Sequence, residues 1–137
     1  MRWFITGTAG FIGSNLVARL IEQGDEVIGL DNLSAGKQEN VDRVMSKANG
    51  RYQFVRGDTR NSDEIEACLE GKVDVVIHLA AQGSVQKSFS DVAYNNAQNI
   101  DGFLNVLTAT GKKEIGRFIY ASSCAVYGDA GDLPITE

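Results

Sequence analysis

Short apolar runs and longer amphipathic segments alternate along this chain. Five runs are nearly continuous in β-branched, aromatic and aliphatic residues, a pattern typical of parallel strands covered on both faces. The predicted strands are residues 2–6, 26–31, 52–56, 73–79 and 117–122.

The segments between these runs predict helices. Between the first two strands, apolar residues recur at steps of three and four, and Gly24 follows where a helix would end. Two further helices are predicted from residues that cap helices well to a closing glycine: from Asn61 or Ser62 to Gly71, and from Ser90 or Asp91 to Gly111. Residues 32–50 are expected to form a loop to Gly36 and then a helix through Val41, Val44 and Met45.

The alternation of strands and helices predicts an α/β fold. Right-handed crossovers then give a three-layer, open parallel sheet, most simply with the strand order 3-2-1-4-5. We therefore expect one Rossmann-type domain over residues 1–137.

Composition narrows the possible partners. The 137 residues include 13 Lys+Arg and 18 Asp+Glu, a formal net charge of −5, with no long basic run, which argues against binding nucleic acid or an anionic membrane. The N-terminus is broken by glycines, so it does not resemble a signal or membrane-spanning segment. Two cysteines and one histidine form no zinc or disulfide pattern. We expect a cytoplasmic protein without a metal site.

A glycine-rich turn follows the first predicted strand and opens the first predicted helix. Gly7 permits a tight turn, Gly10 lets backbone amides approach a pyrophosphate, and Gly13 lets the helix pack closely on the strand. The helix N-terminus itself attracts anions. The motif favours a dinucleotide site, although a turn without a ligand has the same glycines.

Acidic residues end the next two predicted strands. A carboxylate at Asp31 can accept hydrogen bonds from both ribose hydroxyls of adenosine and would repel the 2′-phosphate of NADP, so NAD is favoured. Asp58 lies at the same edge of the sheet and could accept the adenine amino group. A purely turn-forming role is the alternative for each.

Small and hydroxyl-bearing residues follow the fourth and fifth predicted strands. The small side chains after Leu79 would let a dinucleotide lie across the strand end. Ser122 and Ser123 could bind a substrate oxygen beside a nicotinamide, or simply form a solvated strand end. His78, the only histidine, is expected to be a core residue.

Together these segments resemble the N-terminal part of the extended short-chain dehydrogenase/reductase family, and within it the NAD-dependent nucleotide-sugar epimerases and dehydratases. The resemblance covers the whole chain. It is carried, in the family's order, by TGTAGFIG (6–13), LDNLSAGKQENV (30–41), GD (57–58), HLAAQGS (78–84), NIDGFLNVL (99–107) and YASSCAVYG (120–128).

The resemblance implies roles for individual positions. Ser123 matches the family's catalytic serine or threonine, and Ser84 matches a position near the substrate sugar. The implied NAD-binding residues are Gly7, Gly10, Phe11, Ile12 and Gly13 at the pyrophosphate; Asp31, Asn32, Ser34, Ala35 and Gly36 at the adenosine ribose; Asp58 and Thr59 at the adenine; and Leu79, Ala80, Ala81, Gln98 and Asn99 along the cofactor.

Two departures from the family pattern refine the expectation. Family dehydratases carry an Asp-Glu pair after the catalytic hydroxyl, whereas this chain has Cys124 and Ala125, which favours a 4-epimerase of UDP-glucose or UDP-N-acetylglucosamine. The family's base is the tyrosine of a Tyr-xxx-Lys motif, and Tyr127 does not match it. We therefore expect an incomplete domain, truncated after the fifth strand and lacking the C-terminal substrate domain, that binds NAD without turnover.

Other interpretations stay open: a non-catalytic NAD-sensing or interaction module, or a fragment of a sugar-nucleotide dehydratase or reductase. The resemblance implies a homodimer of the full-length protein through the helix that contains Phe103 and Leu107. The unpaired edge of the fifth strand predicts that this chain self-associates.

Overall fold

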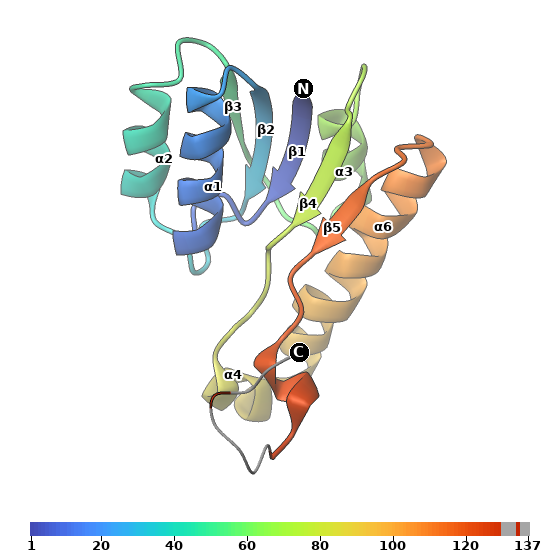
Figure 1. Ribbon diagram of the computed structural model, residues 1–137. Coiled ribbons are helices and arrows are strands. Elements are labelled where there is room, and N and C mark those ends of the chain that lie inside the picture. The colour runs from blue at the N-terminus through green and yellow to red at the C-terminus, as the bar shows by residue number, and fades with distance from the viewer. Residues whose placement is uncertain (130–133, 135–137) are drawn as a thin grey trace.

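The computed structural model shows a twisted sheet with helices on both faces (Figure 1). It describes residues 1–129 and 134, so the last residues of the predicted domain lie outside the described part. The elements are β1 (Arg2–Thr6), α1 (Phe11–Glu22), β2 (Glu26–Asp31), α2 (Gln38–Met45), β3 (Tyr52–Arg56), α3 (Ser62–Cys68), β4 (Val75–His78), α4 (Val85–Ser90), α5 (Val92–Asn96), the π-helical turn η1 (Ala97–Asp101), α6 (Gly102–Lys112), β5 (Phe118–Tyr120) and the 3₁₀ turn η2 (Cys124–Tyr127).

The five strands form one sheet in the order β3-β2-β1-β4-β5, and every neighbouring pair is parallel. This confirms the predicted fold class and strand order. The direction of strand addition reverses between β1 and β4, which places a topological switch point at the carboxyl ends of these two strands.

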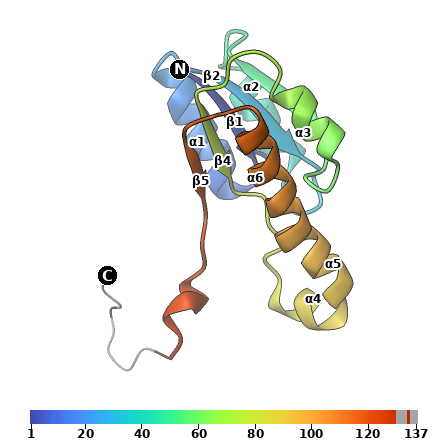
Figure 2. The same ribbon diagram turned by 90° about the vertical axis from the view of Figure 1, so that its right-hand side faces the viewer.

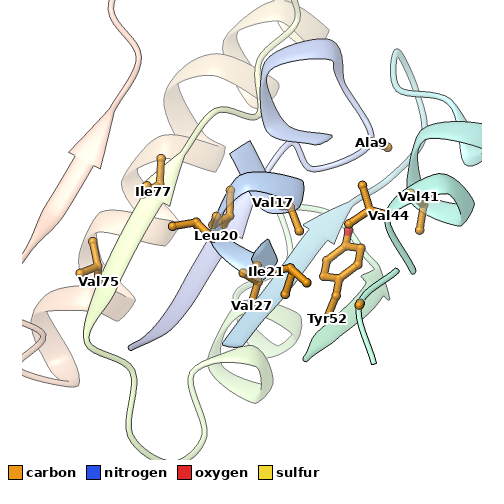
Figure 3. Close-up of a cluster of buried hydrophobic side chains, with 12 residues drawn as sticks. Ala9, Val17, Leu20, Ile21, Val27, Val41, Val44, Tyr52, Val75 and Ile77 are labelled. Atoms are coloured by element: carbon orange, nitrogen blue, oxygen red, sulfur yellow. The ribbon is translucent and has the colours of Figure 1, made fainter. Parts of the chain in front are cut away.

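Two hydrophobic cores, one on each face of the sheet, explain why the strands read as continuous apolar runs. Successive residues of a strand point to opposite faces. Accordingly Ile5, Val75 and Ile77 pack under α1 and α2, in the cluster drawn in Figure 3, whereas Phe4 and Val76 pack under α3 and α6. All five side chains are buried, so neither face of the central strands can accept a polar residue without cost.

Two predicted helix starts and one predicted helix end are confirmed, whereas α3 ends at Cys68 and not at the predicted Gly71. The Asn61 side chain accepts a hydrogen bond from the backbone amide of Asp63 (3.1 Å), and Asp91 caps the next long helix through the amide of Tyr94 (3.0 Å). Gly24, just after α1, has a φ of +89°, a conformation that favours glycine. Among residues 1–129 and 134, no helix combines the length and apolar character needed to cross a membrane.

Two strands are shorter than predicted, since β4 covers only residues 75–78 and β5 only 118–120. At the end of β4, the amides of Leu79 and Ala80 turn toward the hydroxyl of Thr6, at 3.2 Å each. The Thr6 hydroxyl thus binds the backbone at the point where β4 ends, and β5 ends at Tyr120, which pairs with the last residue of β4.

The region after β4 also differs from the prediction. A separate helix, α4, begins at Val85, and the hydroxyl of its N-cap Ser84 accepts a hydrogen bond from the amide of Lys87 (3.3 Å). The predicted long helix is continuous from α5 to α6 but contains the π turn η1. Figure 2 shows that α4, α5 and the turn η2 all lie beyond the end of the sheet.

Candidate functional site

A cavity of about 320 Å³ opens at the carboxyl edge of the sheet, at the switch point between β1 and β4. The turns after β1, β2, β3 and β4 surround it. The residues that line it are Gly7, Gly10, Phe11, Leu30, Asp31, Asn32, Ser34, Ala35, Gly36, Gly57, Thr59, Leu79, Ala80, Ala81, Gly83 and Gln98.

The glycine-rich turn forms one wall because no larger residues fit there. Gly7 has a φ of +77°, and a Cβ at this position would lie 2.7 Å from the amide nitrogen of Ala80. A Cβ at Gly13 would lie 2.1 Å from the Gly7 carbonyl oxygen, so α1 packs directly on the turn. Gly10 occupies the N-cap position of α1 without a side chain. The amides of the first helical turn are therefore left for an anionic ligand.

Asp31 joins the glycine-rich turn to the loop after β2. One carboxylate oxygen accepts a hydrogen bond from the amide of Ala9 (2.9 Å), and the other accepts one from the amide of Leu33 (2.8 Å). Asp31 thus forms the turn and also lines the cavity. Since each carboxylate oxygen has two acceptor positions, the side chain can still bind ribose hydroxyls.

The carboxylate of Asp58 is hydrogen-bonded to neighbouring side chains. Its carboxylate accepts hydrogen bonds from Nε and Nη2 of Arg60 (3.0 and 2.8 Å) and from Nδ2 of Asn32 (2.8 Å). The Arg60 guanidinium holds the pKa of Asp58 well below its usual range. Neighbouring Gly57 and Thr59 line the cavity, whereas Asp58 does not. A contact between Asp58 and adenine stays a prediction.

A buried polar group beneath the cavity sets the shape of its floor. The Thr6 hydroxyl accepts from the amides of Leu79 and Ala80 and lies 2.8 Å from Nδ1 of His78. Because it already accepts two hydrogen bonds, the hydroxyl donates its own proton to Nδ1. Burial lowers the pKa of His78 to about 4, so the ring is neutral with its proton on Nε2. The expected core role of His78 is confirmed.

A second cavity, of about 1150 Å³, adjoins the first and shares Leu79, Ala80, Ala81 and Gly83 with it. Ser123, expected to be the catalytic hydroxyl, and Ser84, expected to lie near the substrate sugar, both line this cavity. The Ser123 hydroxyl accepts a hydrogen bond from the amide of Ala125 (3.2 Å). Among the described residues, those that line it are His78, Leu79, Ala80, Ala81, Gln82, Gly83, Ser84, Val85, Ser88, Asn95, Asn99, Ile100, Phe103, Ala121, Ser122, Ser123, Ala125 and Val126.

The π turn η1 contributes to both cavities. Gln98 lines the first, and Asn99 lines the second. The Asn99 side chain donates to the carbonyl of Gln82 (3.0 Å) and accepts from its amide (2.7 Å), which fixes the loop after β4. Single π turns often occur at functional sites. Here the turn directs two consecutive side chains toward neighbouring parts of the site.

The structure brings most of the predicted cofactor residues to the first cavity. Four do not line it: Ile12 and Gly13 lie further along α1, Asp58 lies between two lining residues without lining the cavity itself, and Asn99 belongs to the second cavity. Those that line the first cavity are Gly7, Gly10, Phe11, Asp31, Asn32, Ser34, Ala35, Gly36, Thr59, Leu79, Ala80, Ala81 and Gln98.

Sequence reasoning missed Thr6 and Gln82. Thr6 is the polar residue at the carboxyl end of the largely apolar strand β1, and this position in the sequence was the available signal. Gln82 depends on a contact with Asn99, 17 residues away in the chain, so no local pattern reveals it.

The sheet order, the glycine-rich turn at the switch point and the acidic residue after β2 together define a Rossmann-type nucleotide-binding domain. Residues 3–137 match the family described as "NAD dependent epimerase/dehydratase family". The chain belongs to this family.

Relatives of known structure or name are similar along nearly the whole chain. A protein of Methanocaldococcus jannaschii, provisionally named a UDP-glucose 4-epimerase, is 40% identical over 134 residues, which are 97% of this chain and 42% of the relative. The crystal structure of UDP-glucose 4-epimerase from Bifidobacterium longum, in complex with NAD+ and UDP, has a TM-score of 0.91 at 30% identity and covers 100% of this chain and 41% of that one.

A third relative is the UDP-N-acetylglucosamine 4-epimerase of Methanobrevibacter ruminantium M1, solved in complex with UDP-N-acetylmuramic acid. Its TM-score is 0.85 at 36% identity, and the match covers 99% of this chain and 42% of that one. The chain therefore spans about two fifths of the length of these relatives.

Proposed function

We propose that this chain binds NAD and forms the cofactor-binding part of a nucleotide-sugar 4-epimerase of the UDP-glucose or UDP-N-acetylglucosamine type. One observation carries the proposal: the two cavities share the residues that follow β4. A dinucleotide whose adenosine half occupies the first cavity can extend its nicotinamide end into the second, beside Ser123.

The first cavity suits an adenosine diphosphate group. The uncapped N-terminus of α1 supplies amide donors for the pyrophosphate without any Lys or Arg. Asp31 ends β2 beside the cavity, so its carboxylate can accept hydrogen bonds from the ribose hydroxyls and would repel a 2′-phosphate. The next residue is Asn32, not a cation that could bind such a phosphate. These features favour NAD over NADP.

The second cavity suits the sugar of a nucleotide sugar. Bound NAD would supply a reversible hydride acceptor for the 4-position of that sugar. The Ser123 hydroxyl would hold the 4-oxygen, and Ser84 would lie near the sugar ring, since both line this cavity. With Cys124 and Ala125 after Ser123, the chain has no carboxylate at the positions where dehydration would need one.

Proton transfer in this reaction needs a further group. The sequence contains no Tyr-xxx-Lys pair, which is the base that the family resemblance implies. We therefore propose that this chain alone binds NAD but does not interconvert sugars.

The exposed apolar residues Leu104 and Leu107 on α6 support a homodimer of the full-length protein. For that protein we propose a cytoplasmic location.

Substitution of the ribose-binding carboxylate tests the proposal. Calorimetric titration of the chain should show saturable NAD binding that is at least about tenfold tighter than NADP binding, because Asp31 repels the extra phosphate. Asp31→Asn should weaken NAD binding and remove most of that preference. Asp42→Asn, which makes the same charge change on exposed α2, is the control and should leave both affinities unchanged.

Two results would contradict the proposal. One is the absence of saturable NAD binding by the unaltered chain. The other is an Asp31→Asn variant that keeps the full preference for NAD, because the ribose would then be recognised by other residues.

A further inference from the structure

A separate groove of about 530 Å³ lies between α1 and α2, the two helices seen side by side on one face of the sheet in Figure 1. It begins near the middle of α1 and ends at the residues that precede β3, so it extends toward the amino ends of the strands. It shares no residue with the two cavities at the carboxyl edge. Its lining is Asn15, Ala18, Arg19, Ile21, Glu22, Arg43, Val44, Lys47, Asn49 and Arg51.

Four of these lining residues are cationic and one is acidic. Glu22 is paired with Arg19 at 3.4 Å. In the part of the chain that the structure describes, Arg43, Lys47 and Arg51 form no ion pair within 4.0 Å. The whole chain has a net charge of −5. The groove is instead locally positive, because three cations without an ion-pair partner among the described residues line it.

The cations that line the groove come from three different segments of the chain. Arg19 belongs to α1 and Arg43 to α2, while Lys47 and Arg51 lie in the connection to β3. Nη2 of Arg43 donates a hydrogen bond to the hydroxyl of Ser14 (3.3 Å), which orients its guanidinium between the two helices. This arrangement fits a compact anion better than an extended acidic peptide.

The base of the groove is apolar and firmly packed. Ile21 and Val44 belong to the hydrophobic cluster between the helices and the sheet (Figure 3), and they are 6% and 4% exposed. The side chains of Asn15 and Asn49 add hydrogen-bonding groups to the lining. The groove thus has the volume of a small-molecule site, with an apolar base and a mainly polar and charged rim.

We propose that this groove binds a small, multiply charged phosphate compound, independently of the dinucleotide site. Guanidinium groups donate paired hydrogen bonds that match phosphate oxygens, and an ammonium group adds a point charge. An anion held by Arg43 and Lys47 on one side and Arg19 on the other connects α1 to α2. Its binding therefore stabilises the helix that carries the glycine-rich turn.

Titration with inorganic tripolyphosphate tests this site. The chain is first saturated with NAD, so that the glycine-rich turn is occupied, and amide chemical shifts are followed during the titration. We expect saturable binding with the largest shifts at Asn49 and Arg51. Lys47→Glu should weaken it at least about tenfold, because it replaces an attraction by a repulsion at the rim.

Lys113→Glu is the matched control. Lys47 and Lys113 are both exposed lysines within two residues of the end of a helix, so the two variants make the same charge change in similar surroundings. Lys113 lies at the end of α6, on the opposite face of the sheet (Figure 1). Its substitution should change tripolyphosphate affinity by less than about twofold, since only screened long-range charge is altered.

Three results would overturn the proposal: no saturable binding of tripolyphosphate, equal weakening by the two substitutions, or equally tight binding of an oligoglutamate peptide. Failure of the dinucleotide proposal remains distinguishable. If NAD does not bind, the same titration on the free chain still reports the groove through Asn49 and the glycine-rich turn through Gly10.

Discussion

The neutral, buried His78 predicts how stability depends on pH. Burial lowers its pKa to about 4 in the folded chain, whereas in the unfolded chain the value is about 6.5. As pH falls through 6.5, His78 binds a proton in the unfolded state but not in the folded state. Stability is therefore complete above about pH 7 and decreases toward pH 4, with a slope approaching 1.4 kcal/mol per pH unit.

Between pH 7 and pH 5 the loss should be about 2 kcal/mol. This window isolates His78, because it is the only histidine, and the lowered pKa values of Asp25, Asp58 and Asp74 put their titration below it. The N-terminal amine, whose pKa is raised by its hydrogen bond to Asp25, stays protonated throughout.

Urea unfolding, followed by the fluorescence of the single tryptophan, Trp3, measures this loss. The comparison variant is His78→Asn, which keeps a hydrogen-bond acceptor for the Thr6 hydroxyl but cannot take up a proton. Its free energy of unfolding is expected to be nearly constant from pH 7 to pH 5. A loss below about 0.5 kcal/mol in the unaltered chain, or an equal loss in the variant, would refute the reasoning.

Three other predictions concern packing, charge and edges. Gly13→Ala should lower the free energy of unfolding by about 1–3 kcal/mol, because its Cβ would collide with the Gly7 carbonyl. The control is Gly116→Ala, where no atom lies within 4 Å of the added Cβ, and equal urea midpoints for the two variants would contradict the packing argument. Arg60→Met should raise the pKa of Asp58 toward its usual range, measured by carboxyl NMR titration, and an unchanged pKa would assign the effect to other groups. This chain should self-associate in light scattering through the exposed edge of the sheet, and Ile119→Lys, in edge strand β5, should reduce it; a monomer at high concentration would count against this expectation.

The order of strands and helices was predictable, because a strand that is buried on both faces consists almost entirely of apolar residues. Phe4 and Ile5 are both fully buried although they face opposite sides of the sheet, so β1 reads as an apolar run. Two helix starts were predictable for a similar reason, since Asn61 and Asp91 cap these helices through hydrogen bonds to amides two or three residues later. Signals of this kind involve residues within a few positions of each other.

The features that escaped prediction depend on distant contacts. At the early end of β4, the backbone amides bind the hydroxyl of Thr6, which lies more than 70 residues earlier in the chain. The π turn places Gln98 and Asn99 in different cavities, whereas a regular helix pattern gives no sign of it. Asp58 lies beside the predicted site, but its engagement by Arg60 and Asn32 follows from the folded loop.

Binding of NAD at the carboxyl edge of the sheet is the central claim, and a residue-resolved titration tests it most directly. On addition of NAD, the amides of Gly10, Thr59 and Ala81 should shift together and saturate at one equivalent, while the amide of Lys47, in the groove between α1 and α2, should stay nearly unchanged. Absence of saturation, or shifts centred away from these three turns, would contradict the account.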